Sequence, residues 1–87
     1  LHARAGDTIG QLVHAVARIL DDAGVENPRD EGRDIVAALC DQPRFWPTTH
    51  RDATADAALV EGAARAARKR AQGAPFAYAV GRAAFRH

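Results

Sequence analysis

The sequence predicts an all-α fold, a small bundle of about five helices of which two are short. Apolar residues in the longer segments recur at spacings of three and four, which is the period of an amphipathic helix. Glycine and proline stand where these segments end and begin, as they do at helix boundaries. Much of the 47% apolar content is alanine, so we expect one small domain with a thin core and closely approaching helices.

The first helix is expected to begin after Thr8 and to end at Gly24. Thr8 and Gln11 have the spacing of a capping box, in which each side chain accepts a hydrogen bond from the backbone N–H of the other residue. The apolar residues between these limits form one stripe, which consists of Ile9, Leu12, Val13, Val16, Ile19, Leu20 and Ala23.

A second helix is expected to begin at Pro28, with Asn27 as its N-cap, and to end at Pro43. Acidic residues follow in its first turn, where the helix dipole favours negative charge. The residues predicted to face the core are Ile35, Val36, Leu39 and Cys40. Because only residues 24–26 separate the two helices, we expect them to be neighbours at a steep angle.

The segment 42–52 contains the bulkiest pair of side chains, Phe45 and Trp46. Pro43 and Pro47 leave room for at most one helical turn between them, and residues 48–52 are expected to form a polar loop. Two interpretations of the aromatic pair are open. The pair plugs the open side of the bundle, or it is an exposed contact for a partner, since tryptophan is enriched at interface hot spots.

The longest helix is expected over about residues 55–72, with Thr54 as its N-cap. Its many alanines have the highest helix propensity. The residues predicted to lie along its inner face are Leu59, Ala63, Ala66 or Ala67, and Arg70.

A tight corner is expected where this helix ends. Glycine after a helix and proline at the first position of the next helix are stop and start signals, and both occur here in quick succession. The residues interpreted as structural at this corner are Gly73, Pro75, Phe76, Tyr78, Gly81 and Phe85. We expect the aromatic ones to pack the corner onto the bundle or onto a neighbouring domain.

The net charge is only +1, but the charges are unevenly distributed. All acidic residues lie at or before Glu61, and the basic residues after it are Arg65, Arg68, Lys69, Arg70, Arg82 and Arg86. This one-sign cluster is either the solvated end of a helix, where it suits the dipole, or a surface that attracts an acidic partner.

Several classes of function find no support in the residue types. Serine is absent, and the glycines do not form a Gly-x-Gly-x-x-Gly phosphate loop. The histidines are scattered and Cys40 is the only cysteine, so there is no zinc-ligand spacing and no internal disulfide. No apolar run approaches the roughly 20 residues of a membrane span. Since no signal-peptide pattern opens the chain either, we expect a cytoplasmic protein.

Two motifs resemble the N-terminal domain of the HemK/PrmC family. Residues 68–85 follow the pattern Arg-Lys-Arg-x-x-Gly-x-Pro-x-x-Tyr-x-x-Gly-x-x-x-Phe, which closes that domain in the family. Residues 23–31 read Ala-Gly-Val-Glu-Asn-Pro-Arg-Asp-Glu and resemble the family's helix junction. The chain departs from the family at Gly32, where alanine is usual, and at Ala74 and Ala84, where glutamate is usual.

The HemK/PrmC family comprises bacterial methyltransferases that modify a glutamine of peptide-chain release factors. The resemblance implies that residues 1–81 are a helical substrate-recognition domain and that residues 82–87 begin a linker hairpin to a methyltransferase domain. It implies that S-adenosylmethionine and the catalytic residues belong to that other domain. The implied partners are the release factor and the catalytic domain, and the implied role is to position the Gly-Gly-Gln loop for methylation.

The candidate partner-binding residues are Phe45, Trp46, Arg65, Arg68, Lys69 and Arg70. Two other functions are alternatives. A nucleic-acid-binding module is disfavoured, because the second helix would bring Asp30, Glu31 and Asp34 toward phosphates. The other alternative is a stand-alone protein-interaction bundle. The absence of Met and the ending Phe85-Arg86-His87 argue against it, because they lead us to expect a fragment of a longer protein.

Overall fold

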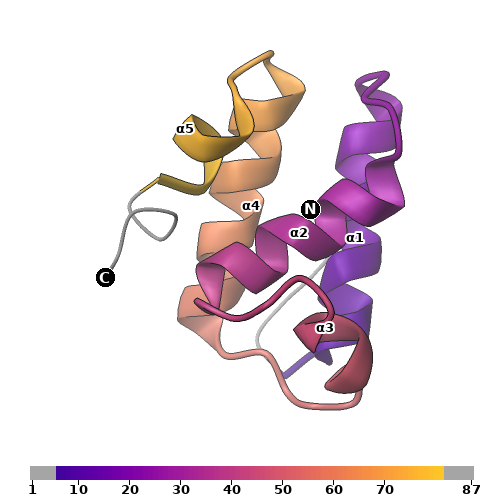
Figure 1. Cartoon of the computed structure of the whole chain (residues 1–87), viewed down its shortest axis with the longest axis vertical. Coiled ribbons are helices and arrows are strands. Elements are labelled where there is room, and N and C mark those ends of the chain that lie inside the picture. Colours follow the sequence, from indigo (N-terminus) through magenta and orange to yellow (C-terminus); the bar gives the residue numbers. More distant parts are fainter. Residues whose placement is uncertain (1–5, 82–87) are drawn as a thin grey trace.

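The computed structural model describes residues 6–81, and five helices account for most of them (Figure 1). The helices are α1 (Ile9–Asp22), α2 (Pro28–Leu39), α3 (Trp46–Thr49), α4 (Ala57–Ala71) and α5 (Phe76–Val80). The described residues contain no strand, apart from one isolated antiparallel bridge between Thr8 and Thr54. The predicted all-α bundle with two short helices is confirmed. Phe85 and the expected linker, residues 82–87, lie outside the described residues.

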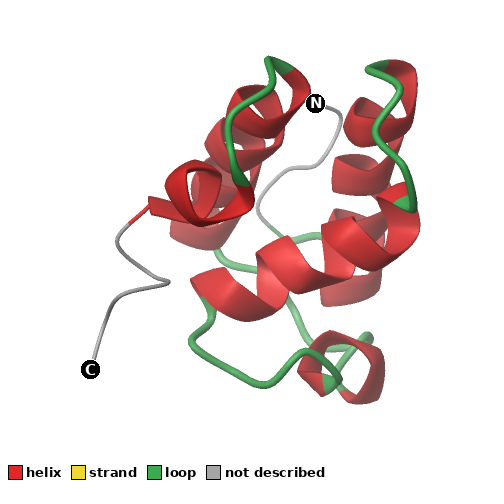
Figure 2. Ribbon diagram, turned by 45° about the horizontal axis from the view of Figure 1, so that its top comes forward, coloured by secondary structure: helices red, strands yellow, loops and turns green. Residues whose placement is uncertain are grey.

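The core lies where α2 crosses α1 and α4 (Figures 1 and 2). α3 packs against α1 and α2, and α5 packs along α4. The largest core side chains come from α1 and α2, while α4 contributes mainly alanines, as the composition predicts. The buried cluster consists of Ile9, Leu12, Val16, Leu20, Ile35, Val36, Ala55, Val60, Ala63, Ala66, Ala67 and Val80.

Both ends of α1 are formed as the sequence predicts. Thr8 Oγ1 accepts a hydrogen bond from the Gln11 N–H at 3.1 Å, and Gln11 Oε1 accepts one from the Thr8 N–H at 2.8 Å. Beyond the other end, Gly24 has a φ of +81°, which glycine adopts without steric cost. Both ends of this helix therefore carry the local signals that the sequence analysis used to predict its extent.

Gly32 allows a close approach of α2 to α1. A Cβ atom at this position would lie 3.1 Å from the carbonyl oxygen of Val13 and 3.2 Å from the amide nitrogen of Ala17. Both atoms belong to the backbone of α1 and cannot rotate away. Gly32 is thus a position of tight contact between the two helices.

The predicted start of α2 is confirmed, with Asn27 as the N-cap residue and Pro28 as the first helical residue, whereas the predicted end needs correction. Asn27 has a φ of +51°, and its side chain makes no cap hydrogen bond, because a side-chain cap requires an extended backbone at that residue. Its carbonyl still accepts a hydrogen bond from the Glu31 N–H at 3.0 Å. The helix ends at Leu39 rather than Pro43, since Asp41 adopts a φ of +57° and interrupts the helical backbone.

The segment predicted to be a polar loop after Pro47 is partly helical. α3 includes Thr48 and Thr49, and Pro47 is buried in its first turn. Proline is tolerated there because the N–H it lacks would have no partner within the helix. Only the residues after Thr49 form the connection to α4.

The N-cap of α4 is Asp56, not Thr54 as predicted. Asp56 Oδ1 accepts a hydrogen bond from the Leu59 N–H at 2.8 Å. Thr54 instead pairs with Thr8, and the neighbouring Ala55 N–H donates to the Asp7 carbonyl at 2.7 Å. These backbone contacts hold Thr54 in an extended segment, so the helix begins after it.

The inner face of α4 is also turned relative to the prediction. Val60 is buried, whereas Leu59 and Arg70 are only half-buried. The predicted alanines, Ala63, Ala66 and Ala67, are all buried. Because the alanines of α4 occur on most sides of the helix, its sequence does not show a single apolar stripe.

Candidate partner-binding surface

A groove of about 530 Å³ lies between the end of α2, α3 and the first half of α4. It brings together Trp46 and Arg65, two of the predicted partner-binding residues, from different helices. The complete lining consists of Leu39, Cys40, Gln42, Trp46, Asp56, Ala58, Leu59, Gly62 and Arg65. The groove therefore combines aliphatic surface with an aromatic ring and a cation.

Trp46 is held firmly at the edge of this groove. It is half-buried, packs against the core, and stacks on His50 with the ring centroids 4.4 Å apart. Its carbonyl accepts a hydrogen bond from the Thr49 hydroxyl at 3.1 Å. Phe45 differs, because 64% of its surface is exposed. The structure thus divides the aromatic pair, with Trp46 covering the core and Phe45 facing solvent.

Cys40 lies half-buried in the same groove, near the N-cap of α4. Burial, and secondarily the negative charge of Asp56, raise the pKa of this thiol above its ordinary value of 9.0. The thiolate is the nucleophilic form of cysteine, so a raised pKa lowers the reactive fraction of Cys40 at neutral pH. Its contribution to the groove is that of a small apolar side chain.

The basic residues of α4 divide between two surroundings. Arg65 is exposed at the groove, while Arg68 and Lys69 are exposed in the last turn of the helix. The Lys69 ammonium lies 5.2 Å from the centroid of the Tyr78 ring, within cation–π range. Arg70 is half-buried and donates a hydrogen bond to the Ala74 carbonyl at 3.2 Å.

Two glycines with positive φ flank α5: Gly73, with a φ of +100°, lies in the corner between α4 and α5, and Gly81, with a φ of +64°, is the C-cap of α5. Pro75 is the N-cap of α5 rather than its first helical residue, because its backbone is extended. Phe76 packs against the core, as expected for a structural residue. Tyr78 does not pack in this way, since 64% of its surface is exposed.

The groove beside Trp46 is also lined by Leu39, Leu59 and Gly62, which no sequence motif marks as binding residues. The apolar periodicity predicts that the two leucines face the core, but both are only half-buried. Gly62 is the only signal that sequence offers, since a glycine inside an alanine-rich helix leaves a gap in its side-chain surface.

The described part of the chain contains no candidate metal centre. Within residues 6–81, no group of three or more His, Cys, Asp or Glu side chains is placed to hold a metal ion. The same range has no strand leading into a glycine loop. None of its helices combines the length and the hydropathy that crossing a membrane requires.

These features define a small all-α domain that presents an open groove. A family model described as the PrmC N-terminal domain matches residues 11–81. Because the match covers most of the chain, the chain belongs to the PrmC N-terminal domain family, as the two sequence motifs predict. Comparison with curated proteins finds no match, and neither does comparison with solved structures.

Proposed function

We propose that this domain helps a release-factor methyltransferase to recognise and position its protein substrate. The groove beside Trp46 carries the proposal, because it joins an aromatic anchor, aliphatic side chains and Arg65 on one surface. Tryptophan and arginine are enriched among the residues that dominate binding at protein interfaces. Membership of the PrmC N-terminal domain family supplies the link to this class of methyltransferase.

In this proposal the chemistry takes place in a separate catalytic domain, which binds S-adenosylmethionine. The helical domain binds the release factor away from the reacting glutamine and contributes binding energy that orients the Gly-Gly-Gln loop. The exposed Phe45 extends the contact beyond the groove. We place this reaction in the cytoplasm, where a release factor is available as substrate.

The proposal is tested by methyl transfer from labelled S-adenosylmethionine to a purified release factor. The intact methyltransferase that contains this chain is compared with a version lacking residues 1–87. We expect the truncation to raise the KM for the release factor, because substrate binding is lost while the catalytic domain remains. Equal kinetics in both proteins would instead make the domain a fold or stability element.

Two substitutions test the proposed contact surface, one in the groove and one beside it, without removing the whole domain. Arg65→Glu and Phe45→Ala alter exposed side chains, so the fold should be unchanged. We expect each to raise KM, by about tenfold for the loss of an interface anchor. Arg18→Glu is the control, because Arg18 is exposed on α1 and does not line the groove. A similar rise in KM for Arg18→Glu would assign the effect to overall charge.

A further inference from the structure

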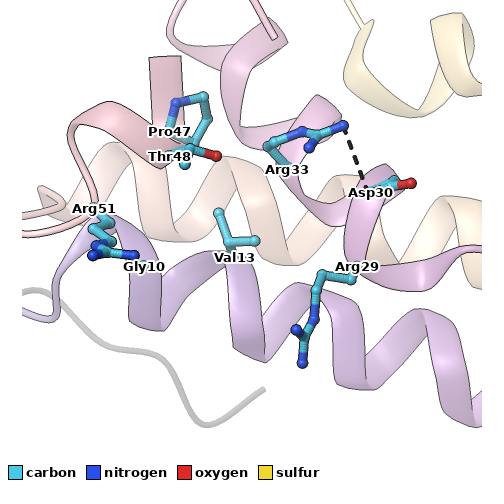
Figure 3. Close-up of a pocket in the computed structure, with 8 residues that line it drawn as sticks. All are labelled: Gly10, Val13, Arg29, Asp30, Arg33, Pro47, Thr48 and Arg51. Carbon is cyan, nitrogen blue, oxygen red and sulfur yellow. Dashed lines mark ion pairs between the residues drawn. The ribbon is translucent and has the colours of Figure 1, made fainter. Parts of the chain in front are cut away.

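A second, smaller depression lies between α1, α2 and the segment around α3 (Figure 3). Its volume is about 220 Å³, and its apolar lining residues are Val13 of α1 and Pro47 of α3. Arg29 and Arg33 border it from α2, and Arg51 borders it from the connection after α3. We refer to these five residues as the arginine pocket.

Backbone contacts hold one wall of the arginine pocket in place. The Gly10 N–H donates a hydrogen bond to the Arg51 carbonyl at 2.9 Å. A Cβ atom at Gly10 would lie 3.2 Å from Arg51 Cβ, so the absence of a side chain there permits the close approach. On the other side, Pro47 is fully buried. The position of Arg51 therefore follows from the fold itself.

The charges in the arginine pocket are unbalanced. Three arginine residues line it, but only one acidic residue, Asp30. Asp30 lies 3.7 Å from Arg33 Nη2, and Asp34 lies 3.7 Å from Arg33 Nε, both at the outer range of an ion pair. Within residues 6–81, Arg29 and Arg51 form no ion pair. Two exposed guanidinium groups are thus available to an anion.

We propose that the arginine pocket binds an acidic side chain of the protein that this domain docks, an inference that rests on the proposed function. A guanidinium group offers parallel N–H donors that match a carboxylate. Val13, which is only half-buried, provides apolar surface for the methylene groups of that side chain. Pockets for whole small molecules measure about 300–1,000 Å³, so about 220 Å³ suits a single side chain better.

The surroundings of the arginine pocket favour a protein over a nucleic acid. Asp30 and Asp34 both lie on α2 beside Arg33, and a phosphate backbone running along this helix would approach their carboxylates. A single acidic side chain carries one negative charge rather than a row of them, so it meets less of that repulsion than a phosphate backbone does.

The double variant Arg29→Gln/Arg51→Gln tests the arginine pocket. Both side chains are exposed and unpaired within residues 6–81, so a melting temperature equal to that of the wild type verifies the fold. Binding of the release factor to the intact methyltransferase is measured by calorimetry at low and high salt. We expect the affinity to fall at least about tenfold, with a weaker dependence on salt, because charge-assisted hydrogen bonds are lost. Arg18→Gln is the matched control and should bind as the wild type does.

The outcomes separate this inference from the proposed function. If Arg29→Gln/Arg51→Gln binds the release factor as tightly as the wild type and Arg65→Glu binds it more weakly, the inference about the arginine pocket is wrong and the proposed function stands. No binding by the wild type would overturn both. Duplex DNA is titrated under the same conditions. If it binds more tightly than the release factor and only the double variant loses it, the ligand is phosphate and the inference is wrong.

Discussion

The guanidinium group of Arg70 lies 3.2 Å from Glu31 Oε1, although 39 residues separate the two in the sequence. Arg70 Nε is 2.5 Å from the second carboxylate oxygen, and the two side chains are only 25% and 18% exposed. This ion pair joins α4 to α2, while the hydrogen bond to the Ala74 carbonyl ties both to the corner. Arg70, a member of the predicted basic cluster, therefore forms an ion pair inside the domain.

Arg70→Ala is expected to lower the free energy of unfolding by about 1–3 kcal/mol, because it leaves the Glu31 carboxylate partly buried without its cation. Arg68→Ala is the matched control, since Arg68 is exposed in the last turn of the same helix, and it should change stability by less than about 0.5 kcal/mol. Urea unfolding followed by circular dichroism measures both. Equal losses would show that the ion pair adds nothing to the fold.

Asp56→Ala is expected to cost about 1 kcal/mol of unfolding free energy, because Asp56 caps α4 through the Leu59 N–H. Thr54→Ala should cost less than about 0.5 kcal/mol, since Thr54 takes part in the bridge through its backbone. The comparison uses urea unfolding of both variants under identical conditions. If Thr54→Ala lowered the free energy of unfolding more than Asp56→Ala does, Thr54 rather than Asp56 would be the N-cap of α4.

Gly62→Ala is expected to raise the free energy of unfolding by about 0.5–1 kcal/mol, because alanine is the better helix former and its Cβ would meet Leu39 methyl groups at 3.7 and 3.8 Å. Gly32→Ala should give no such gain, since its Cβ would press on the α1 backbone and α2 would have to shift. Thermal and urea unfolding decide the matter. Equal stabilisation by both would mean that the two helices separate without cost.

Alkaline pH should destabilise the domain through Cys40. Its pKa is raised in the folded state, so the unfolded chain loses this proton first as the pH rises. The contribution to stability is complete below the ordinary pKa of 9.0 and is lost as the pH rises toward the folded-state pKa. The free energy of unfolding should therefore decline more steeply above about pH 9 in the wild type than in Cys40→Ala.

The charge of Asp56 provides a second check on Cys40. Asp56→Asn retains a side chain that can cap the helix but removes the negative charge, so the pKa of the thiol should fall. Thiolate absorbance measured against pH reports this pKa directly. An unchanged titration midpoint in Asp56→Asn would assign the raised pKa to burial alone.

Some of the candidate surface was accessible from the sequence. Tryptophan at position 46 and the arginine at position 65 are residue types that proteins use as interface anchors, and the sequence alone marks them as candidates. Their place on one groove follows from the packing of α3 beside α4, which no local pattern encodes. No local pattern predicts the arginine pocket either, because α1, α2 and the connection after α3 each supply part of it.

By itself, the sequence determined the features that depend on neighbouring residues. The capping box at Thr8, the left-handed glycines at 24 and 73 and the short apolar helix after Pro75 follow from local hydrogen bonding and backbone sterics. The tertiary structure alone decided which residue caps α4, which face of that helix is buried and which acid pairs with Arg70. Those choices depend on the free energy of packing segments that lie far apart in the chain, where a short-range pattern carries no information.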